Sequence, residues 1–324
     1  MHVTIIPGVK SPVSLARPDL FHPKIVLAGC PQLVSGDGDD DGVIEALRTR
    51  GLHARWLSWD DPQTEAADLV ILRATWDYAE RRDEFLAWTT RVPNLLNGPA
   101  VVAWNSDKHY LDDLAAAGVP TLPSSFFEPG EQLRLPKGEV VVKPAIGAGS
   151  IDTRRFTDRT AAREHAAALQ ASGRTALVQP YDARVEAGET ALVFLGGEQS
   201  HAFTKGPMLP PEGELPELDE SGTFAAESLR GADPDFAMWD VGYAALDAAA
   251  RHLGIARGDL LYARVDLIGG PDAPLLLELE LIEPSLGWRQ LDEPTRALQQ
   301  RAFALAVESA CERLGLGPLS HRRP

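Results

Sequence analysis

The stretch EVVVKPAIGAGSIDTRR, residues 139–155, joins a strand, a cation and a flexible loop. Its apolar, β-branched start at residues 140–142 predicts a buried strand. Lys143 follows directly, and the small residues from Gly147 to Ser150 let the backbone approach a ligand closely. A cation beside such a loop suits a polyphosphate. A surface hairpin whose lysine reaches water fits the same residues, so both interpretations stand on this stretch alone.

The size and composition of the chain limit what it does. At 324 residues it exceeds one ordinary core, so two or three packed subdomains are expected. A hydrophobic content of 44% and a charged content of 24% are typical of a soluble globular protein. Lysine and arginine number 31 against 47 acidic residues, and the net charge of -16 disfavours nucleic acid and anionic membranes as partners.

Targeting signals and cysteines indicate the cytoplasm. No apolar run approaches the ~20 residues that cross a bilayer, and the start of the chain lacks a basic-then-apolar signal pattern. Cys30 and Cys311 are too few for a disulfide framework and fit a reducing compartment. We therefore expect a cytoplasmic protein. Its oligomeric state stays open between a monomer and a homo-oligomer.

The N-terminal part of the chain alternates strand and helix patterns. We treat residues 1–23 as an irregular extension. The sequence then predicts helices and strands in alternation: strands at 24–28, 53–59, 68–72 and 101–104, helices at 43–50 and 84–91. Such alternation favours a parallel α/β layer, so residues 24–105 are predicted to form an N-terminal α/β domain.

Polar and aromatic residues follow the third of these strands. In open α/β sheets, ligands gather beyond the carboxyl ends of the strands. Arg73 stands at this end, and Trp76 and Tyr78 follow it. Arg73 is therefore a candidate clamp for a substrate carboxylate. An ordinary surface ion pair between Arg73 and Asp77 is the alternative.

Another lysine opens the middle of the chain. Residues 105–108 are predicted to begin a helix that runs through residue 117. Lys108 falls in its first turn, where a positive charge opposes the helix dipole. That placement suggests that Lys108 faces an anion, with a solvated lysine as the alternative.

The segments downstream alternate again between strands, helices and loops. The strand predicted at 176–182 runs into Pro180, and backbone groups freed beside a proline are available to a planar heterocycle. Glu186 and Glu189 follow it. The residues at 209–235, rich in Pro, Gly and Glu, predict a long loop, with a lid as one interpretation. The remaining predicted elements are strands at 124–127, 190–196 and 200–205, the last ending in Lys205, and helices at 160–171, 239–253 and 291–314.

Acidic residues share one face of a hairpin predicted at residues 260–284. Alternation places Arg264 and Asp266 on one face of its first strand. In the second strand, Glu278 and Glu280 lie opposite a leucine face formed by Leu275, Leu277, Leu279 and Leu281. If Asp266 pairs with Glu278, Arg264 pairs with Glu280, and a slip by one residue would put acids among leucines.

This acidic face has two interpretations. Mg²⁺ takes oxygen ligands from one or two carboxylates together with phosphates, and three clustered carboxylates suit it. A solvated face of an amphipathic hairpin is the alternative. Glu283, next to Pro284, is a further candidate ligand.

Other chemical motifs are missing from the sequence. It holds no P-loop pattern, and residues 147–149 lack the third glycine of the dinucleotide fingerprint. The histidines have no zinc-site spacing. Neither cysteine has the neighbours of an activated nucleophile.

Taken in order, these motifs resemble those of the ATP-grasp superfamily. The resemblance covers residues 24–288 and rests on NSDK, VVVKP with its small-residue loop, VQPYD, and RVDL followed by LELELIEP. The strings LRATWDY, WNSDKHYL, SHAFTK and LELELIEPSL look like the branch that contains the cycloserine-forming O-ureido-serine cyclo-ligase. The implied fold is an N-terminal parallel α/β domain at 24–105 followed by two α+β subdomains, 106–182 and 183–324, that clamp ATP.

The resemblance implies an ATP site. Lys108 and Lys143 would contact the phosphates, and the loop with Gly147, Gly149 and Ser150 would cover them. The hinge that reads adenine would consist of Gln179, Pro180, Tyr181 and Asp182. Glu186 or Glu189 would bind the ribose.

The resemblance also implies a metal site and catalytic cations. Asp266, Glu278 and Glu280 would hold Mg²⁺, while Lys205 and Arg264 would face the transferring phosphoryl group. Many family members have Glu-x-Asn where this chain has Glu278-x-Glu280. Glu283 is therefore the alternative to Glu280 for completing the metal site.

The implied chemistry activates a carboxylate as an acyl phosphate, which a nitrogen then attacks. In a cyclo-ligase that nitrogen belongs to the same small, amino-acid-like substrate, here an O-ureido-serine that closes to cycloserine in antibiotic biosynthesis. Arg73 would hold the substrate, with Trp76 or Tyr78 as a wall. Two alternatives stay open: an intermolecular carboxylate–amine ligase, and a non-catalytic ATP-binding regulatory protein, against which the intact Arg264 and Asp266 count.

Overall fold

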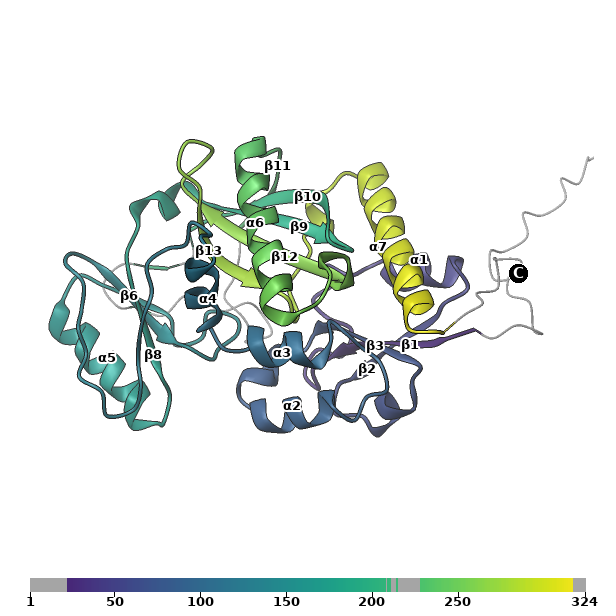
Figure 1. Cartoon of the computed structure of the whole chain (residues 1–324), viewed down its shortest axis with the longest axis horizontal. Helices are drawn as coiled ribbons and strands as arrows, with labels where there is room; N and C mark the ends of the chain where they lie inside the picture. The colour runs from purple at the N-terminus through teal and green to yellow at the C-terminus, as the bar shows by residue number, and fades with distance from the viewer. Residues whose placement is uncertain (1–21, 208, 211–213, 215–227, 317–324) are drawn as a thin grey trace, which may run out of the picture.

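The structure is a computed structural model that describes residues 22–207, 209–210, 214 and 228–316. Three sheets organise these residues (Figure 1). The expected irregular extension, except for its last two residues, and most of the predicted loop at 209–235 lie outside the described residues. Within the described ranges, no helix is both long and apolar enough for a bilayer span.

The first sheet is parallel and has the order β2-β1-β3-β4. It consists of β1 (Lys24–Gly29), β2 (His53–Ser58), β3 (Leu69–Ala74) and β4 (Leu95–Leu96). Its connections carry α1 (Val43–Thr49) and α2 (Arg82–Thr89), and α3 (Pro99–Asn105) follows its last strand. The predicted parallel α/β layer is therefore confirmed.

One predicted strand in this region is wrong. Residues 101–104 lie in α3, and the fourth strand is the two-residue β4. Pro99 is at the first turn of α3, where its fixed φ favours a helix and its missing N–H costs nothing. Val101 packs against the core of the third sheet and Val102 against that of the first. A short apolar run that is buried on both sides does not distinguish a strand from a helix.

The second sheet is antiparallel, with the order β5-β8-β6-β7. Its strands are β5 (Ser125–Phe127), β6 (Val140–Pro144), β7 (Arg154–Phe156) and β8 (Ala176–Pro180). Helix α5 (Arg159–Ala171) packs on it through Ala162, Ala166 and Leu169. The Asp158 side chain caps α5 by accepting from the Thr160 N–H at 2.8 Å.

The third sheet is antiparallel and has the order β11-β10-β9-β12-β13. Its strands are β9 (Glu189–Leu195), β10 (Glu198–Lys205), β11 (Leu229–Ala232), β12 (Tyr262–Ile268) and β13 (Leu275–Glu280). Helices α4 (Tyr110–Ala116) and α6 (Phe236–Leu253) share a core with it. Strand β11 falls within residues 209–235, where the sequence predicts only a loop.

Helix α7 (Glu293–Arg313) returns the end of the chain to its beginning. Its residues Phe303, Ala304 and Val307 join a core with Ile25 and Leu27 of β1. Arg50, at the end of α1, lies 2.6 Å from the fully buried Glu308. Figure 1 shows α7 beside α1. Helix α7 shares one hydrophobic core with residues of both the N-terminal sheet and the third sheet. Short 3₁₀ turns complete the fold: η2 (Pro62–Ala66), η3 (Trp76–Ala79), η4 (Ala183–Ala187), η5 (Arg257–Asp259) and η6 (Trp288–Gln290).

Candidate active site

A cavity of about 560 Å³ is lined by most of the predicted functional residues, and Arg73, Glu186 and Asp266 are outside its lining. One side is the loop after β6 and the end of β8, and the other is the face of β12 and β13. Residues of the N-terminal domain complete its far end. The cavity therefore lies where all three parts of the chain meet.

The β12–β13 hairpin pairs as its alternation predicts. Arg264 lies opposite Glu280, and Asp266 opposite Glu278. The register shifts after Asp266, so that Leu276 takes the buried position and Leu277 faces the cavity. The expected leucine face is therefore interrupted by a bulge, which leaves the acidic pairs in place.

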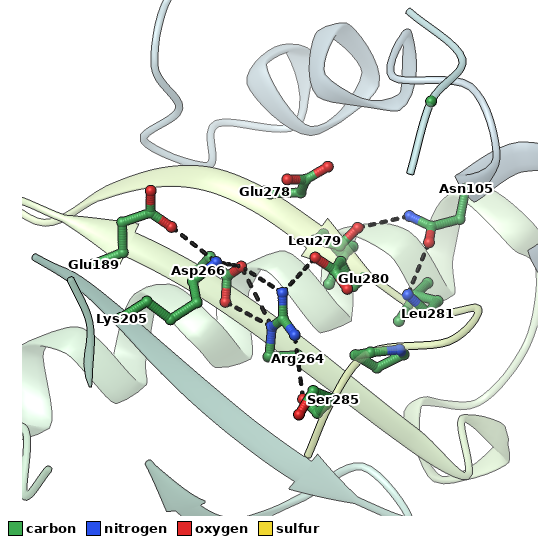
Figure 2. A network of polar contacts seen from close by, with 12 residues as sticks. Asn105, Glu189, Lys205, Arg264, Asp266, Glu278, Leu279, Glu280, Leu281 and Ser285 are labelled. Atoms are coloured by element: carbon green, nitrogen blue, oxygen red, sulfur yellow. Dashed lines mark hydrogen bonds and ion pairs between the residues drawn. The ribbon is translucent and has the colours of Figure 1, made fainter. Parts of the chain in front are cut away.

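Asp266 is the most enclosed carboxylate of the site. It is fully buried, and Arg264 Nε donates to its Oδ1 at 3.0 Å (Figure 2). Lys205 Nζ lies 2.6 Å from Asp266 Oδ2 and 2.8 Å from Glu189 Oε2. Burial opposes ionisation of Asp266, but Arg264 and Lys205 outweigh it and hold its pKa below the ordinary value.

The two glutamates of β13 differ in their electrostatic surroundings. Burial opposes ionisation of Glu278, but Lys108, 3.1 Å away, and Lys143 lower its pKa to about 2. Burial raises the pKa of Glu280 to about 7; Arg264 opposes the shift, while Asp266 and Glu278 add to it. Glu280 also accepts a hydrogen bond from Arg264. Nearby cations thus favour the ionised forms of Asp266 and Glu278, whereas burial favours the neutral form of Glu280.

Lys143 is buried, lines the cavity and is the next-to-last residue of β6. Within the described part of the chain its ammonium makes no hydrogen bond or ion pair. Burial lowers the pKa of Lys143; Glu278 opposes the shift and Lys108 adds to it. A buried cation without a partner is costly, so this position calls for an anion in the cavity.

Lys108 ties the glycine-containing loop to the acidic face. Its Nζ donates to the Gly147 carbonyl at 2.9 Å and also meets Glu278. The predicted helix start at 105–108 is wrong, because α4 begins at Tyr110 and Lys108 precedes it. The loop from Gly147 to Ser150 lines the cavity, as expected.

The residues predicted as the hinge lie at the end of β8 and directly after it. Gln179, Pro180, Tyr181 and Asp182 all line the cavity. Arg155 lies 3.6 Å from the centre of the Tyr181 ring, a cation–π contact that fixes the ring. Of the two candidate ribose ligands, Glu189 lines the cavity, whereas the exposed Glu186 lies outside its lining and accepts from the Tyr181 hydroxyl.

The structure places Arg73 away from the cavity. The residue is 2% exposed, and its Nε lies 3.1 Å from Asp40 Oδ2 while its Nη2 donates to the Pro284 carbonyl at 3.0 Å. The alternative Arg73–Asp77 pair is also wrong, since Asp77 accepts from Trp59 instead. Trp76 and Tyr78 do line the cavity.

Three residues that the sequence did not single out line the same end of the cavity. They are Asp37, Ser285 and Arg289. Arg289 Nη2 lies 3.3 Å from Asp37 Oδ2. The buried Asp39 holds this corner together, because its carboxylate accepts from the Gly287 N–H at 2.8 Å and the Ser285 hydroxyl at 3.1 Å. The acidic run at 37–41 was the available signal, although it also fits an ordinary turn.

Comparison with known proteins identifies this architecture. A family model described as the N-terminal domain of D-cycloserine synthetase DcsG matches residues 25–97. The cycloserine biosynthesis protein DcsG of Streptomyces lavendulae is 39% identical over 271 residues, which span 77% of this chain and 88% of that protein. This chain belongs to the DcsG family.

Solved structures agree with this membership. The crystal structure of D-cycloserine synthetase DcsG matches with a TM-score of 0.74 and 34% identity, over 90% of this chain and 99% of that one. A D-alanine–D-alanine ligase from Bacillus anthracis, complexed with ATP, matches with a TM-score of 0.61 and 12% identity, over 91% and 98% of the chains. That second likeness shows the fold alone. The DcsG homologue described here is thus an enzyme of the ATP-grasp ligase class, as the sequence predicts.

Proposed function

We propose that this protein is an ATP- and Mg²⁺-dependent cyclo-ligase that closes an O-ureido-serine-like amino acid to cycloserine. The observation that carries the proposal is Lys143, a buried cation without a hydrogen bond or ion pair to any described residue, in one cavity with Glu278 and Glu280 of β13. A phosphate group would give Lys143 an anionic partner, and a divalent cation would give the glutamates a cationic one. The 39% identity to a cycloserine biosynthesis protein supports the choice of substrate.

The nucleotide occupies the side of the cavity formed by the second sheet. Lys108 and Lys143 bind its phosphates, and the loop of Gly147, Gly149 and Ser150 covers them. Gln179, Pro180, Tyr181 and Asp182 line the part that takes the adenine. We assign the ribose to Glu189 in preference to Glu186, because only Glu189 lines the cavity.

The acidic face fits Mg²⁺ in donor type, because Asp266, Glu278 and Glu280 carry hard carboxylate oxygens. Glu278 and Glu280 line the cavity, whereas Asp266 is outside its lining and pairs with Arg264 and Lys205. Among the described residues, no three such side chains already stand in metal-binding positions. Bound Mg²⁺ would neutralise phosphate charge, and Glu283, which also lines the cavity, remains the alternative to Glu280.

The substrate occupies the far end, which the N-terminal domain supplies. Asp37 and Arg289 offer a carboxylate and a guanidinium to an amino acid's ammonium and carboxylate, and Trp76 and Tyr78 form the walls. Arg73 does not line this end but stabilises the chain next to it, through an ion pair with Asp40 and a hydrogen bond to the Pro284 carbonyl. This assignment replaces Arg73 as the residue that holds the substrate.

The chemistry needs no protein nucleophile. A substrate carboxylate oxygen attacks the terminal phosphorus of ATP, and ADP leaves. The nitrogen bonded to the substrate's own oxygen then attacks the acyl carbon and loses its proton, phosphate leaves, and a five-membered ring closes. Hydrolysis of the carbamoyl group that this nitrogen carries consumes water, releases carbon dioxide and ammonia, and leaves cycloserine. Lys205 and Arg264 face the reacting phosphoryl group and stabilise its negative charge, so catalysis rests on positioning and electrostatics.

Phosphate release with defined substrates tests the proposal. With O-ureido-serine alone, we expect one phosphate for each cycloserine formed, and with serine we expect none. An intermolecular ligase would need a second amine before it releases phosphate. A non-catalytic ATP-binding protein would release none with any substrate, and either result would overturn the proposal.

A further inference from the structure

We propose that Asn105 and Tyr110 are positioning residues that hold Glu278 and Glu280 in place by completing the free edge of β13. The inference rests on the proposed function, because it assigns these glutamates to the metal side of the site. It concerns residues that lie before the second sheet in the sequence, far from the carboxylates they act on.

Strand β13 is the last strand of the third sheet. One edge pairs with β12, so Glu278 and Glu280 use their backbone groups there. Leu279 and Leu281 point their N–H and C=O groups the other way, toward an edge without a neighbouring strand. Buried backbone groups need partners, and both of these leucines are buried.

Side chains satisfy this edge at Leu279 and Leu281, whereas the backbone of Pro120 and Leu122 satisfies it at Leu276. Leu279 N–H donates to the Tyr110 hydroxyl at 3.1 Å. Asn105 Nδ2 donates to the Leu279 carbonyl at 2.8 Å, and Leu281 N–H donates to Asn105 Oδ1 at 2.7 Å. The Leu281 carbonyl accepts from Asn97 Nδ2 at 2.7 Å. The Asn105 carboxamide therefore imitates one residue of a missing strand, as Figure 2 shows.

These bonds bracket the residues that face the cavity. Asn105 forms hydrogen bonds to the backbone on both sides of Glu280, and Tyr110 accepts one from the residue that follows Glu278. Lys108, between the two, contacts Glu278 directly. A shift of β13 by one residue would exchange glutamates for leucines at the cavity. The hydrogen bonds of Asn105 and Tyr110 oppose that shift and so determine which side chains reach the cavity. Partners that orient metal ligands typically change metal affinity by 10–100-fold when removed.

Asn97 provides a matched control. It is fully buried and makes the same kind of bonds to the same hairpin, to the backbone of Leu261, Tyr262 and Leu281. None of those three residues lines the cavity. Loss of Asn97 should therefore destabilise the hairpin without moving the carboxylates.

The experiment compares Asn105→Ala, Tyr110→Phe and Asn97→Ala. Two quantities are measured: hydrogen exchange of the Leu279 and Leu281 amides in nucleotide-free protein, and the Mg²⁺ concentration that half-saturates binding of a non-hydrolysable ATP analogue. We expect Asn105→Ala to speed exchange at Leu281 and raise the Mg²⁺ requirement about 10-fold or more. Tyr110→Phe should speed exchange at Leu279 with a smaller rise, and Asn97→Ala should change the requirement less than about twofold.

An unchanged Mg²⁺ requirement in both Asn105→Ala and Tyr110→Phe would overturn the inference, as would an equal rise in Asn97→Ala. If Asn105→Ala does not fold, the milder Tyr110→Phe decides alone. Wild-type protein that binds no nucleotide with Mg²⁺ would instead overturn the proposed function. The two failures are therefore distinguishable.

Discussion

At the scale of single residues, Lys143 and Arg73 show what a sequence reveals and what it hides. Lys143 was predicted as a ligand-facing cation because it ends a buried strand beside a flexible loop, and the structure places it in the cavity. Arg73 also ends a strand, but its partner is Asp40, which lies 33 residues earlier in the chain. Which side of a sheet an arginine turns to depends on such distant partners, and a single sequence does not display them.

Lys143→Met should abolish ATP-dependent turnover. The same substitution should raise the thermal midpoint of the ligand-free protein, because it removes a buried charge without a partner. Lys137, exposed and outside the cavity, gives the control variant Lys137→Met. Turnover assays and thermal unfolding measure both effects, and normal turnover in Lys143→Met would be incompatible with the phosphate assignment.

Replacement by glutamine should affect stability at Arg73 and substrate binding at Arg289. Arg73→Gln breaks a buried ion pair and should lower the free energy of unfolding by about 3–5 kcal/mol. Arg289→Gln, at an exposed side chain, should change it by less than about 0.5 kcal/mol but raise KM for the substrate. Denaturant unfolding and steady-state kinetics separate the two. An unchanged KM in Arg289→Gln would remove it from the substrate site.

His201 should make stability depend on pH. Burial lowers its pKa to about 4, and its Nε2 lies 2.6 Å from the Leu286 carbonyl. In the unfolded chain this histidine takes up a proton near pH 6.5. The stabilisation from keeping His201 neutral in the folded state is therefore complete above that pH and is lost as pH falls toward 4. Between pH 7 and pH 5, His201→Gln should lose about 2 kcal/mol less than wild type in urea unfolding. Identical pH profiles would show that His201 does not titrate as described.

At the scale of elements, the hairpin was predictable and the neighbouring helix was not. The β12–β13 register followed from alternation, because any slip buries acids among leucines. The bulge at Leu277 did not follow, since it depends on how β13 docks against residues 120–122. Residues 101–104 became a helix because both of their faces are covered, by different sheets.

Helix α6 packs closely on the third sheet at Gly242. A Cβ at Gly242 would lie 2.8 Å from Phe194 Cζ and 3.0 Å from Leu192 Cδ1. Overpacking costs about 1–3 kcal/mol and should outweigh the gain in helix propensity of about 1 kcal/mol. We expect Gly242→Ala to lower the thermal midpoint. Ala244→Gly, at an exposed position of α6, measures the propensity term alone, and a higher midpoint for Gly242→Ala would contradict the packing.

At the scale of the whole molecule, the order of the parts was predictable and their docking was not. The three sheets fall within residues 24–105, 106–182 and 183–324, and we propose these ranges as the domains of the chain. The cores cross these limits: α4 packs with α6, and α7 packs on β1 and α1. A helical pattern shows that one face is buried but not which sheet covers it. The cavity consequently draws on all three ranges, and Asp37, Ser285 and Arg289 are lining residues that sequence analysis missed.

Isotope transfer tests the central claim, that the substrate carboxylate is activated by phosphorylation and then attacked by a nitrogen of the same molecule. The protein is incubated with ATP, Mg²⁺ and O-ureido-serine that carries ¹⁸O at both carboxylate oxygens. Mass spectrometry then follows the label. We predict that each phosphate released carries one ¹⁸O, while the cycloserine carbonyl keeps the other. Unlabelled phosphate, or labelled phosphate without cycloserine unless a second amine is added, would contradict the account.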